Sequence, residues 1–212
     1  MNNHIGVFGG FKNATSTLQA SFNCKKYHDL PFLIDQNEFN SLDIIIIPFR
    51  KNEHVYPSAF FQDITIPIYG YSPFSEGRFL DKYINHNDDD KKHVVLNTDV
   101  NELYNHYKNI NWDDLIQLNN KMRLYQINNH YKINLKYDSK EIQVLNININ
   151  NKNKKIVCFD SSILNNKFNE IKDIVIGQNE NINLLQSNIG LSKWYKNKYE
   201  EFINYLKSKN EY

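Results

Sequence analysis

The sequence has few cysteines, no long apolar run and almost no net charge. Its two cysteines, Cys24 and Cys158, lie far apart and form no C-x-x-C pair. This spacing argues against a disulfide scaffold and fits a reducing compartment. No segment approaches the ~18 to 20 consecutive apolar residues of a membrane-spanning helix, and the first residues lack the basic and apolar regions of a targeting signal. We therefore expect a soluble, cytoplasmic protein.

The charge balance and the histidine spacing disfavour several classes of partner. The 25 basic and 24 acidic residues give a formal net charge of +1, so neither nucleic acid nor an anionic membrane is an expected partner. The seven histidines never occur at i, i+4 or as H-x-H, and the cysteines do not join them. No metal site is therefore expected. The sequence does not identify a cofactor.

What the chain does contain is enough apolar material for a core. Hydrophobic residues make up 41% of the 212 positions, with 14 Tyr and 13 Phe, so a folded chain is expected despite the many asparagines. No repeat or linker interrupts it. We expect a single domain over residues 1–212, with a parallel α/β core over 1–126 and the remainder, 127–212, packed on that core.

The strongest structural signal is the run of four isoleucines at 44–47, closed by Pro48. A strand with β-branched apolar side chains on both faces has to be covered on both faces, which is typical of a central parallel strand. In open α/β sheets, ligands bind at the carboxyl ends of such strands. Arg50 and Lys51, which follow this strand, are therefore candidate ligand-binding residues.

The order of apolar runs and helix-like spacings predicts an α/β fold with three layers and a mostly parallel, Rossmann-like sheet. The expected strands of the first half cover residues 5–8, 32–34, 44–49, 64–69 and 93–96. The expected helices cover residues 14–23, 37–41, a stretch following Asp99, and 112–126. Polar loops are expected over residues 50–57 and 85–92.

The second half shows a different pattern. Strict alternation over residues 131–137 and 142–149, with a turn at 138–140, predicts an antiparallel hairpin. The apolar phase changes between Val144 and Leu145, which predicts a β-bulge there. Residues 155–160 and 173–177 read as two further strands. From Ser192 the spacing predicts a helix that closes the fold along the sheet.

A glycine loop after the first strand is the first candidate site. Gly9, Gly10, Lys12 and Asn13 lie between that strand and the first expected helix, where amides and hydroxyls can bind a phosphate or carboxylate. The loop is neither G-x-G-x-x-G nor a Walker motif. The competing interpretation is a glycine turn followed by a helix cap.

A second group of candidates follows the isoleucine strand. The Arg50 guanidinium suits a phosphate or carboxylate, Lys51 adds positive charge, and Glu53 or His54 has the chemistry of a general acid or base. The alternative is a solvated polar loop. Two other polar runs have simpler interpretations, Asp88-Asp89-Asp90 as a solvated loop and Asp160-Ser161-Ser162 as a helix cap.

The stretch Gly70-Tyr71-Ser72-Pro73-Phe74 has the strand-turn-helix setting of a nucleophile elbow, although Phe74 replaces the second glycine. Over roughly the first hundred residues the order of elements resembles the amidotransferase-like α/β proteins, with Ser72 where their cysteine stands. The resemblance implies a nucleophile at Ser72. A histidine such as His54 would then act as base, whereas in a protein that only binds a small molecule Gly70 and Tyr71 would contact the ligand. A serine-proline turn that enters a helix is the simpler interpretation.

Three functional hypotheses follow. The first is a protein that binds a small molecule, a nucleotide or another anionic metabolite, and it predicts that the Gly9 loop, Arg50 and the Gly70 turn converge. The second is an enzyme of hydrolase or amidotransferase-like type, with Ser72 as nucleophile and His54, His86 or His130 as base. The third is a protein without catalytic chemistry that binds a protein partner or itself, and a homo-oligomer is compatible with each of the three.

Overall fold

The computed structural model describes residues 2–10, 13–69, 87–115, 118–178, 180, 182–185 and 194–212. The chain forms two compact units, each made of two separate segments. Unit 1 comprises Met1–Asn52 and Ile116–Ile189, and unit 2 comprises Glu53–Leu115 and Gly190–Tyr212. The expectation of one domain over residues 1–212 stays a prediction.

Unit 1 contains a mostly parallel sheet, as the sequence predicted. Within the described part of the chain it has five strands in the order β2-β1-β3-β5-β4, and only β4 runs antiparallel to its neighbour. The isoleucine strand is central, since Ile46 of β3 pairs with Val7 of β1 on one side and Val157 of β5 on the other. The strands are β1 Asn2–Phe8, β2 Cys24–Tyr27, β3 Ile44–Phe49, β4 Gln143–Ile149 and β5 Lys152–Asp160.

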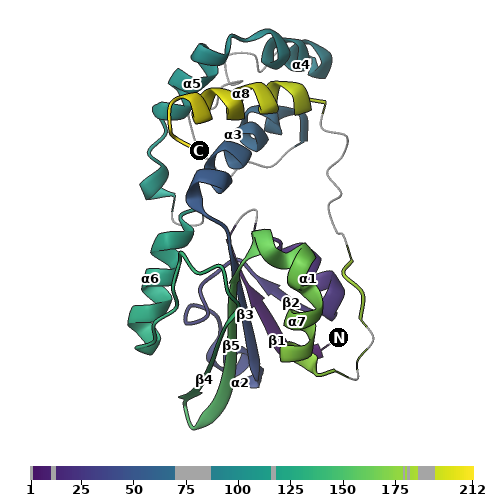
Figure 1. Cartoon of the computed structure of the whole chain (residues 1–212), viewed down its shortest axis with the longest axis vertical. Coiled ribbons are helices and arrows are strands. Elements are labelled where there is room, and N and C mark those ends of the chain that lie inside the picture. Colours follow the sequence, from purple (N-terminus) through teal and green to yellow (C-terminus); the bar gives the residue numbers. More distant parts are fainter. Residues whose placement is uncertain are drawn as a thin grey trace. The chain divides into compact units, whose positions relative to one another are not determined.

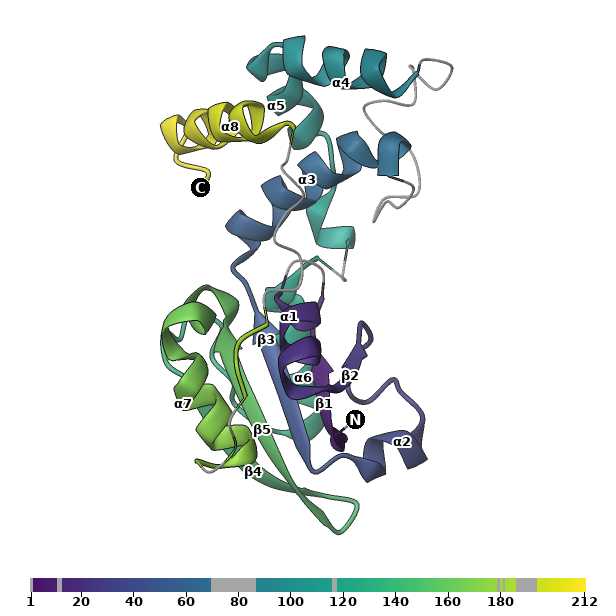
Figure 2. The ribbon, with the colours of Figure 1, turned by 90° about the vertical axis from the view of Figure 1, so that its right-hand side faces the viewer.

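Helices cover both faces of this sheet, which gives the expected three layers. Figure 1 shows α1 and α7 over one face and α6 along the other, and Figure 2 shows the same unit from the side. The helices of unit 1 are α1 Thr15–Phe22, α2 Gln36–Ser41, α6 Asn120–Tyr131 and α7 Leu164–Ile176, and a 3-10 turn, η3 Ser161–Ile163, precedes α7.

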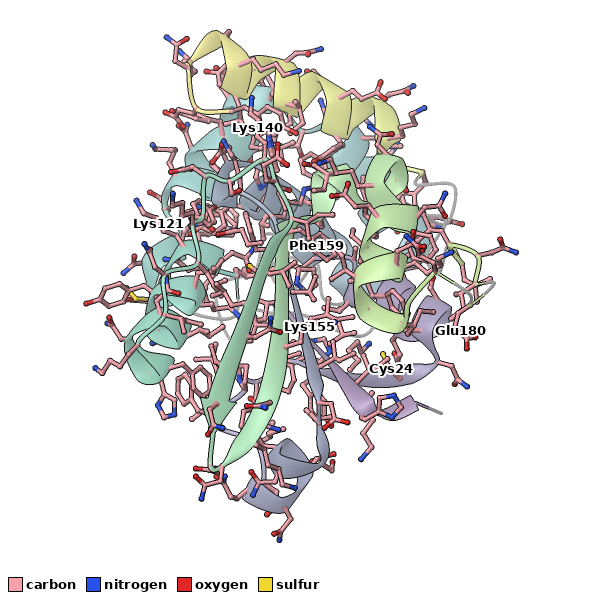
Figure 3. The ribbon with its side chains drawn as sticks, turned by 60° about the horizontal axis from the view of Figure 1, so that its bottom comes forward. Cys24, Lys121, Lys140, Lys155, Phe159 and Glu180 are labelled. Atoms are coloured by element: carbon pink, nitrogen blue, oxygen red, sulfur yellow. The ribbon has the colours of Figure 1, made fainter. Side chains whose placement is uncertain are left out.

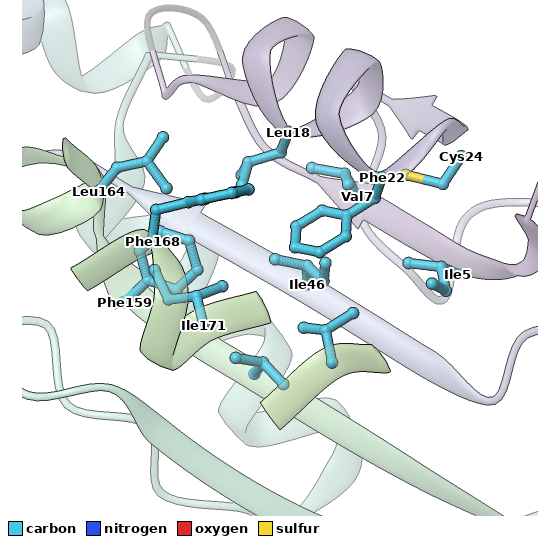
Figure 4. Close-up of a cluster of buried hydrophobic side chains, with 12 residues drawn as sticks. Ile5, Val7, Leu18, Phe22, Cys24, Ile46, Phe159, Leu164, Phe168 and Ile171 are labelled. Carbon is cyan, nitrogen blue, oxygen red and sulfur yellow. The ribbon is translucent and has the colours of Figure 1, made fainter. Parts of the chain in front are cut away.

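The alternation of β3 explains why its isoleucines are needed on both faces. Ile46 points into a core with α1 and α7, which includes Phe22 and Phe168 (Figure 4). Ile45 and Ile47 point into the opposite core, to which α2 and α6 contribute. Because successive strand residues face opposite sides, only a strand that is apolar at every position can serve both cores.

The regular secondary structure of unit 2, within its described residues, is all helical. Its core is strongly aromatic: Phe60, Phe61, Tyr107 and Phe202 are buried together, and Phe60 and Phe202 have ring centroids 5.5 Å apart. The helices are α3 Asn52–Tyr69, α4 Asp88–Asn97, α5 Val100–Lys108, the 3-10 turn η2 Trp112–Asp114, and α8 Lys196–Ser208. Among the described helices, none has both the length and the apolar character needed to cross a membrane.

The C-terminal helix is confirmed as α8, but its packing differs from the expectation. Its buried residues Phe202, Ile203 and Leu206 belong to the aromatic core of unit 2. They pack there with residues of α3, α4 and α5. The periodicity predicted the helix and its apolar face, and it carried no information about which surface that face would cover.

Two predicted strands of the first half were wrong because short apolar runs fit either period, and two predicted loops were wrong as well. Residues 64–69 and 93–96, expected as strands, lie in α3 and α4. The expected loop over 50–57 is largely the start of α3. The expected loop over 85–92 is, from Asp88 on, the first turn of α4, where the Asn87 side chain accepts a hydrogen bond from the Asp90 amide at 2.9 Å. By contrast, α1, α2 and α5 are confirmed.

The second strand was also misplaced. It is β2, Cys24–Tyr27, and not residues 32–34, where Phe32 and Ile34 pack as a loop against the core of α2 and α6. β2 is an edge strand with two lysines, so its sequence carries no apolar run that would mark it.

The antiparallel hairpin exists one strand further along the chain than predicted. β4 pairs with β5, and the turn is Asn150–Asn151, with φ angles of 54° and 60°. Left-handed asparagines at both central positions are typical of the hairpin turn whose twist matches the strands. The expected strand 131–137 is absent, because α6 continues to Tyr131 and residues 132–137 form no strand.

The predicted bulge and the strand at 173–177 were wrong too. The β4–β5 register runs without a shift from Gln143 to Ile149. The phase change has another cause: Ile142 packs against the α1–α7 core, whereas Leu145 and Ile147 pack against the α2–α6 core. Residues 173–176 are the end of α7, which stops at Gly177 with φ 91°.

Candidate functional site at the carboxyl edge of the sheet

The strand order reverses direction between β1 and β3. From β1 the chain continues to β2 on one side and then returns past β1 to β3 on the other. The connecting helices α1 and α2 cover opposite faces. In open α/β sheets such a reversal separates the two loops that follow the strands, and ligands bind there. Here those loops are the Gly9–Asn13 segment and the Arg50–Asn52 segment.

Gly9 has a steric reason to be glycine. Its amide donates to the Tyr27 carbonyl of the neighbouring strand at 3.2 Å. A Cβ atom at this position would lie 2.5 Å from Cγ2 of Thr15 and 3.3 Å from the carbonyl oxygen of Pro48. The start of α1 is therefore held directly against the end of β1, as in loops that bring backbone amides close to a ligand.

Asn13 is buried and bonded to a distant asparagine. Its side chain is 1% exposed, and it donates to Oδ1 of Asn120 at 2.6 Å while Nδ2 of Asn120 donates back to Oδ1 of Asn13 at 3.0 Å. Asn13 is followed by Ala14, with φ 59°, which reverses the chain into α1. Asn13, at the end of the first loop, is thus bonded to the start of α6.

The same asparagine fixes the second loop. Nδ2 of Asn120 also donates to the Arg50 carbonyl at 2.9 Å, and the Asn120 amide donates to Oδ1 of Asn52 at 3.0 Å. Asn52 in turn donates to Oδ1 of Asn119 at 2.9 Å. We call Asn13, Asn52, Asn119 and Asn120 the asparagine cluster. Through it, the loops after β1 and β3 are bonded to one helix end.

Three basic side chains gather on the β2 side of the Gly9 loop. Nζ of Lys26 donates to Oγ of Ser16 in the first turn of α1 at 3.1 Å. Burial and the positive charges of Lys26 and Arg123 lower the pKa of His28, partly offset by a hydrogen bond to the Gly9 backbone. Arg123, 6% exposed, donates through Nη2 to the Asp29 carbonyl at 3.3 Å. We call Lys26, His28 and Arg123 the basic cluster.

Of the predicted ligand-binding residues, the structure brings together Gly9, Asn13 and Arg50. Lys51 follows Arg50 and is half-buried, and Gly10 follows Gly9. The Arg50 guanidinium forms no hydrogen bond or ion pair with the described residues, which leaves it available to a ligand. Lys12, Gly70 and Tyr71 lie outside the described residues, so the convergence of the third loop stays a prediction.

The predicted catalytic residues are not assembled into a site by the described part of the chain. Glu53 and His54 lie in the first turn of α3 and belong to unit 2, where the His54 ring is 4.8 Å from the Tyr212 ring. Ser72 and His86 lie outside the described residues. The hydrolase or amidotransferase-like alternative therefore stays a prediction.

Two further candidates have structural roles. The Asp160 side chain accepts a hydrogen bond from the Ser162 amide at 2.9 Å and caps η3, as the sequence suggested. Asp89 and Asp90 are exposed in the first turn of α4, where their charge is favourable to the helix dipole. Among the residues placed in the structure, no group of three or more His, Cys, Asp or Glu side chains has the arrangement of a metal site.

Sequence reasoning missed Asn120 and Arg123, both in the first turn of α6. Neither follows a strand, so no rule that places sites at strand ends selects them. The only signal is their spacing of three residues, which puts both on one face of a helix.

Comparison of the chain with protein-family models, with curated proteins and with solved structures found no match.

Proposed function

We propose that this protein binds a small anionic molecule, a nucleotide or another anionic metabolite, at the carboxyl edge of its sheet. The ligand would lie over the ends of β1 and β3, with the Gly9 loop on one side and the Arg50 side chain on the other. In this proposal unit 1 serves as a Rossmann-like scaffold. The edge offers N–H donors and positive charge, which suit an oxyanion.

One observation supports this proposal above the others. Asn120 bonds simultaneously to the Asn13 side chain and to the Arg50 carbonyl, so the two loops at the strand-order reversal are held in a fixed relation. A binding site benefits from such preorganisation, because less conformational freedom is lost when the ligand binds. If the buried pair Asn13 and Asn120 only filled space, apolar side chains of the same shape could replace both with little change in the free energy of unfolding.

Thermal-shift screening tests the proposal. The full chain is heated with nucleoside mono-, di- and triphosphates, dinucleotides and sugar phosphates, and hits are confirmed by calorimetric titration. A ligand present at 100 times its Kd stabilises the folded state by about 2.7 kcal/mol, which is readily measured. We expect at least one phosphorylated compound to raise the melting temperature.

The variants Arg50→Ala and Lys140→Ala make this test specific. Arg50→Ala is expected to weaken the hit about tenfold or more, because a charge-assisted hydrogen bond is lost. Lys140 is an exposed lysine in a loop of the same unit (Figure 3), so its removal controls for net charge. Absence of any hit, or equal loss of affinity in both variants, would count against the proposal.

A further inference from the structure

Arg123 is a buried cation that has few interaction partners among the described residues. Its side chain is 6% exposed, yet its hydrogen bond among the described residues is one contact of 3.3 Å to the Asp29 carbonyl. A guanidinium has five N–H donors. Within the described part of the chain Arg123 forms no ion pair, although the nearby Asp29 charge favours its protonated form.

The surroundings add to the cost of this charge. Burial lowers the pKa of Arg123 to about 10. Arg123 lies in the first turn of α6, where the helix dipole is also positive. Lys26 and Arg123 both lie close enough to His28 for their charges to lower its pKa. The nearby Asp29 offsets the buried charge of Arg123 only in part, so an anion at this place would stabilise Arg123 and relieve the repulsion that Lys26 and Arg123 exert on protonated His28.

The three side chains of the basic cluster are attached to the elements around the Gly9 loop. The His28 ring is hydrogen-bonded to the Gly9 backbone, and Lys26 reaches Ser16 in the first turn of α1. Arg123 is one helical turn from Asn120, which holds Asn13 in the same loop. Positive groups from the end of β2 and from α6 therefore meet at the Gly9 loop and the amino end of α1.

We infer that Arg123, together with Lys26 and His28, holds the phosphate group of the ligand beside the Gly9 loop. The inference rests on the proposed function and adds which residues bind the charged end of the ligand. A guanidinium binds two phosphate oxygens through parallel N–H donors, and Lys26 supplies a further positive charge for a dianionic group. The neutral part of the ligand then extends from β1 toward β3 and Arg50.

The experiment measures the affinity of the full chain for inorganic phosphate, AMP, adenosine and succinate by calorimetric titration. Arg123→Met removes the charge and keeps much of the side-chain volume. Arg123→Lys keeps the charge but lacks the two parallel N–H donors of the guanidinium. Lys121→Met is the matched control, since Lys121 is an exposed cation in the same helical turn (Figure 3). Circular dichroism and the melting temperature without anion are recorded for each variant.

We expect phosphate and AMP to bind the unaltered protein and adenosine to bind far more weakly. Arg123→Met should weaken AMP binding about tenfold or more, Arg123→Lys by less, and Lys121→Met not measurably. Without anion, Arg123→Met should melt at the same temperature as the unaltered protein or higher, because an uncompensated charge is gone. If Arg123→Met does not fold, the affinity of Arg123→Lys for AMP is the test, and an affinity equal to that of the unaltered protein would contradict the inference.

The contrary results separate this inference from the proposed function. If AMP binds Arg123→Met as tightly as the unaltered protein but is lost in Arg50→Ala, the phosphate is held elsewhere and only this inference fails. Succinate binding more tightly than phosphate would overturn the assignment to a phosphate group. If the unaltered protein binds none of the phosphorylated compounds in either screen, both conclusions fail.

Discussion

The Nζ atom of Lys154 donates a hydrogen bond to the carbonyl oxygen of Phe39 at 2.9 Å and lies 4.7 Å from the centre of the Phe39 ring. The same ammonium donates to the Leu42 carbonyl. Lys154 is 1% exposed on β5, and Phe39 is in the last turn of α2. Carbonyl groups at the end of a helix have no N–H donor within the helix, and the Lys154 ammonium serves as their donor. The dipole of α2 favours a cation at this end.

We predict that Lys154→Met lowers the free energy of unfolding by about 1–3 kcal/mol, because two buried carbonyls lose their donor. Lys152→Met is the control, since Lys152 donates to the neighbouring Asn40 carbonyl at 3.1 Å but is exposed. It should change stability by less than about 0.5 kcal/mol. Urea denaturation measures both variants, and equal effects would refute a special role for Lys154.

The lysine also has a predictable pH dependence. Burial lowers the pKa of Lys154 below its ordinary 10.5. Between the lowered pKa and 10.5, the unfolded chain binds more protons than the folded one, so the contribution of Lys154 to stability rises with pH. The stability difference between the unaltered protein and Lys154→Met should therefore grow as the pH rises toward 10.5. A difference that shrinks over this range would contradict the lowered pKa.

The reciprocal pair Asn13–Asn120 predicts a coupled effect on stability. Each single replacement by alanine leaves a buried amide without its partner and should cost about 1–3 kcal/mol. The double replacement should cost less than the sum, with a coupling of about 0.5–3 kcal/mol. Asn148→Ala is the control, since Asn148 donates to Asn153 at 3.1 Å on the exposed hairpin. Additive losses at Asn13 and Asn120 would show that the two amides act independently.

Gly9 predicts a rescue experiment. Gly9→Ala places a Cβ 2.5 Å from Cγ2 of Thr15 and should cost about 1–3 kcal/mol, as overpacking usually does. Adding Thr15→Ser removes that methyl group, so the double variant should regain part of the loss. Thr15→Ser alone serves as reference. Thermal unfolding measures all three, and no recovery in the double variant would mean that the clash is not with Thr15.

The two cysteines should be inert while the protein is folded. Cys24 and Cys158 are 1% and 0% exposed, and burial raises the pKa of Cys24 to about 12 and that of Cys158 further. Because the thiolate is the reactive form, neither should react with a thiol reagent at about pH 8 until the protein unfolds. Lys140→Cys, at an exposed position, is the positive control. Rapid labelling of the unaltered protein would contradict this prediction.

The sequence predicted those elements whose structure is determined by residues near in sequence, and it failed for elements determined by tertiary contacts. The isoleucines of β3 need cover on both faces, which is a property of the strand itself, so its central place was predictable. The capping residue Asp99 acts on a neighbouring amide, and α5 was predicted for that reason. By contrast, Val94 and Val95 are equally suited to a strand and to a helix in an aromatic core.

The candidate site was predictable to the same extent. Gly9, Asn13 and Arg50 follow predicted strands, so the topology of parallel sheets selects them. Arg123 and Asn120 reach these loops only because α6 packs against the sheet from a distant part of the sequence. Their role depends on tertiary contacts, and a reading of local pattern has no access to those.

The pairing of Ile46 with both Val7 and Val157 has a consequence for the order of folding. β1 and β3 are made early, whereas β5 follows only after the first segment of unit 2 has been synthesised. One edge of β3 therefore leaves the ribosome without its neighbouring strand. Closing so long a loop is slow and leaves an unpaired isoleucine edge exposed in the meantime. The nascent chain consequently has an interval in which its most apolar strand is a target for chaperones and for aggregation.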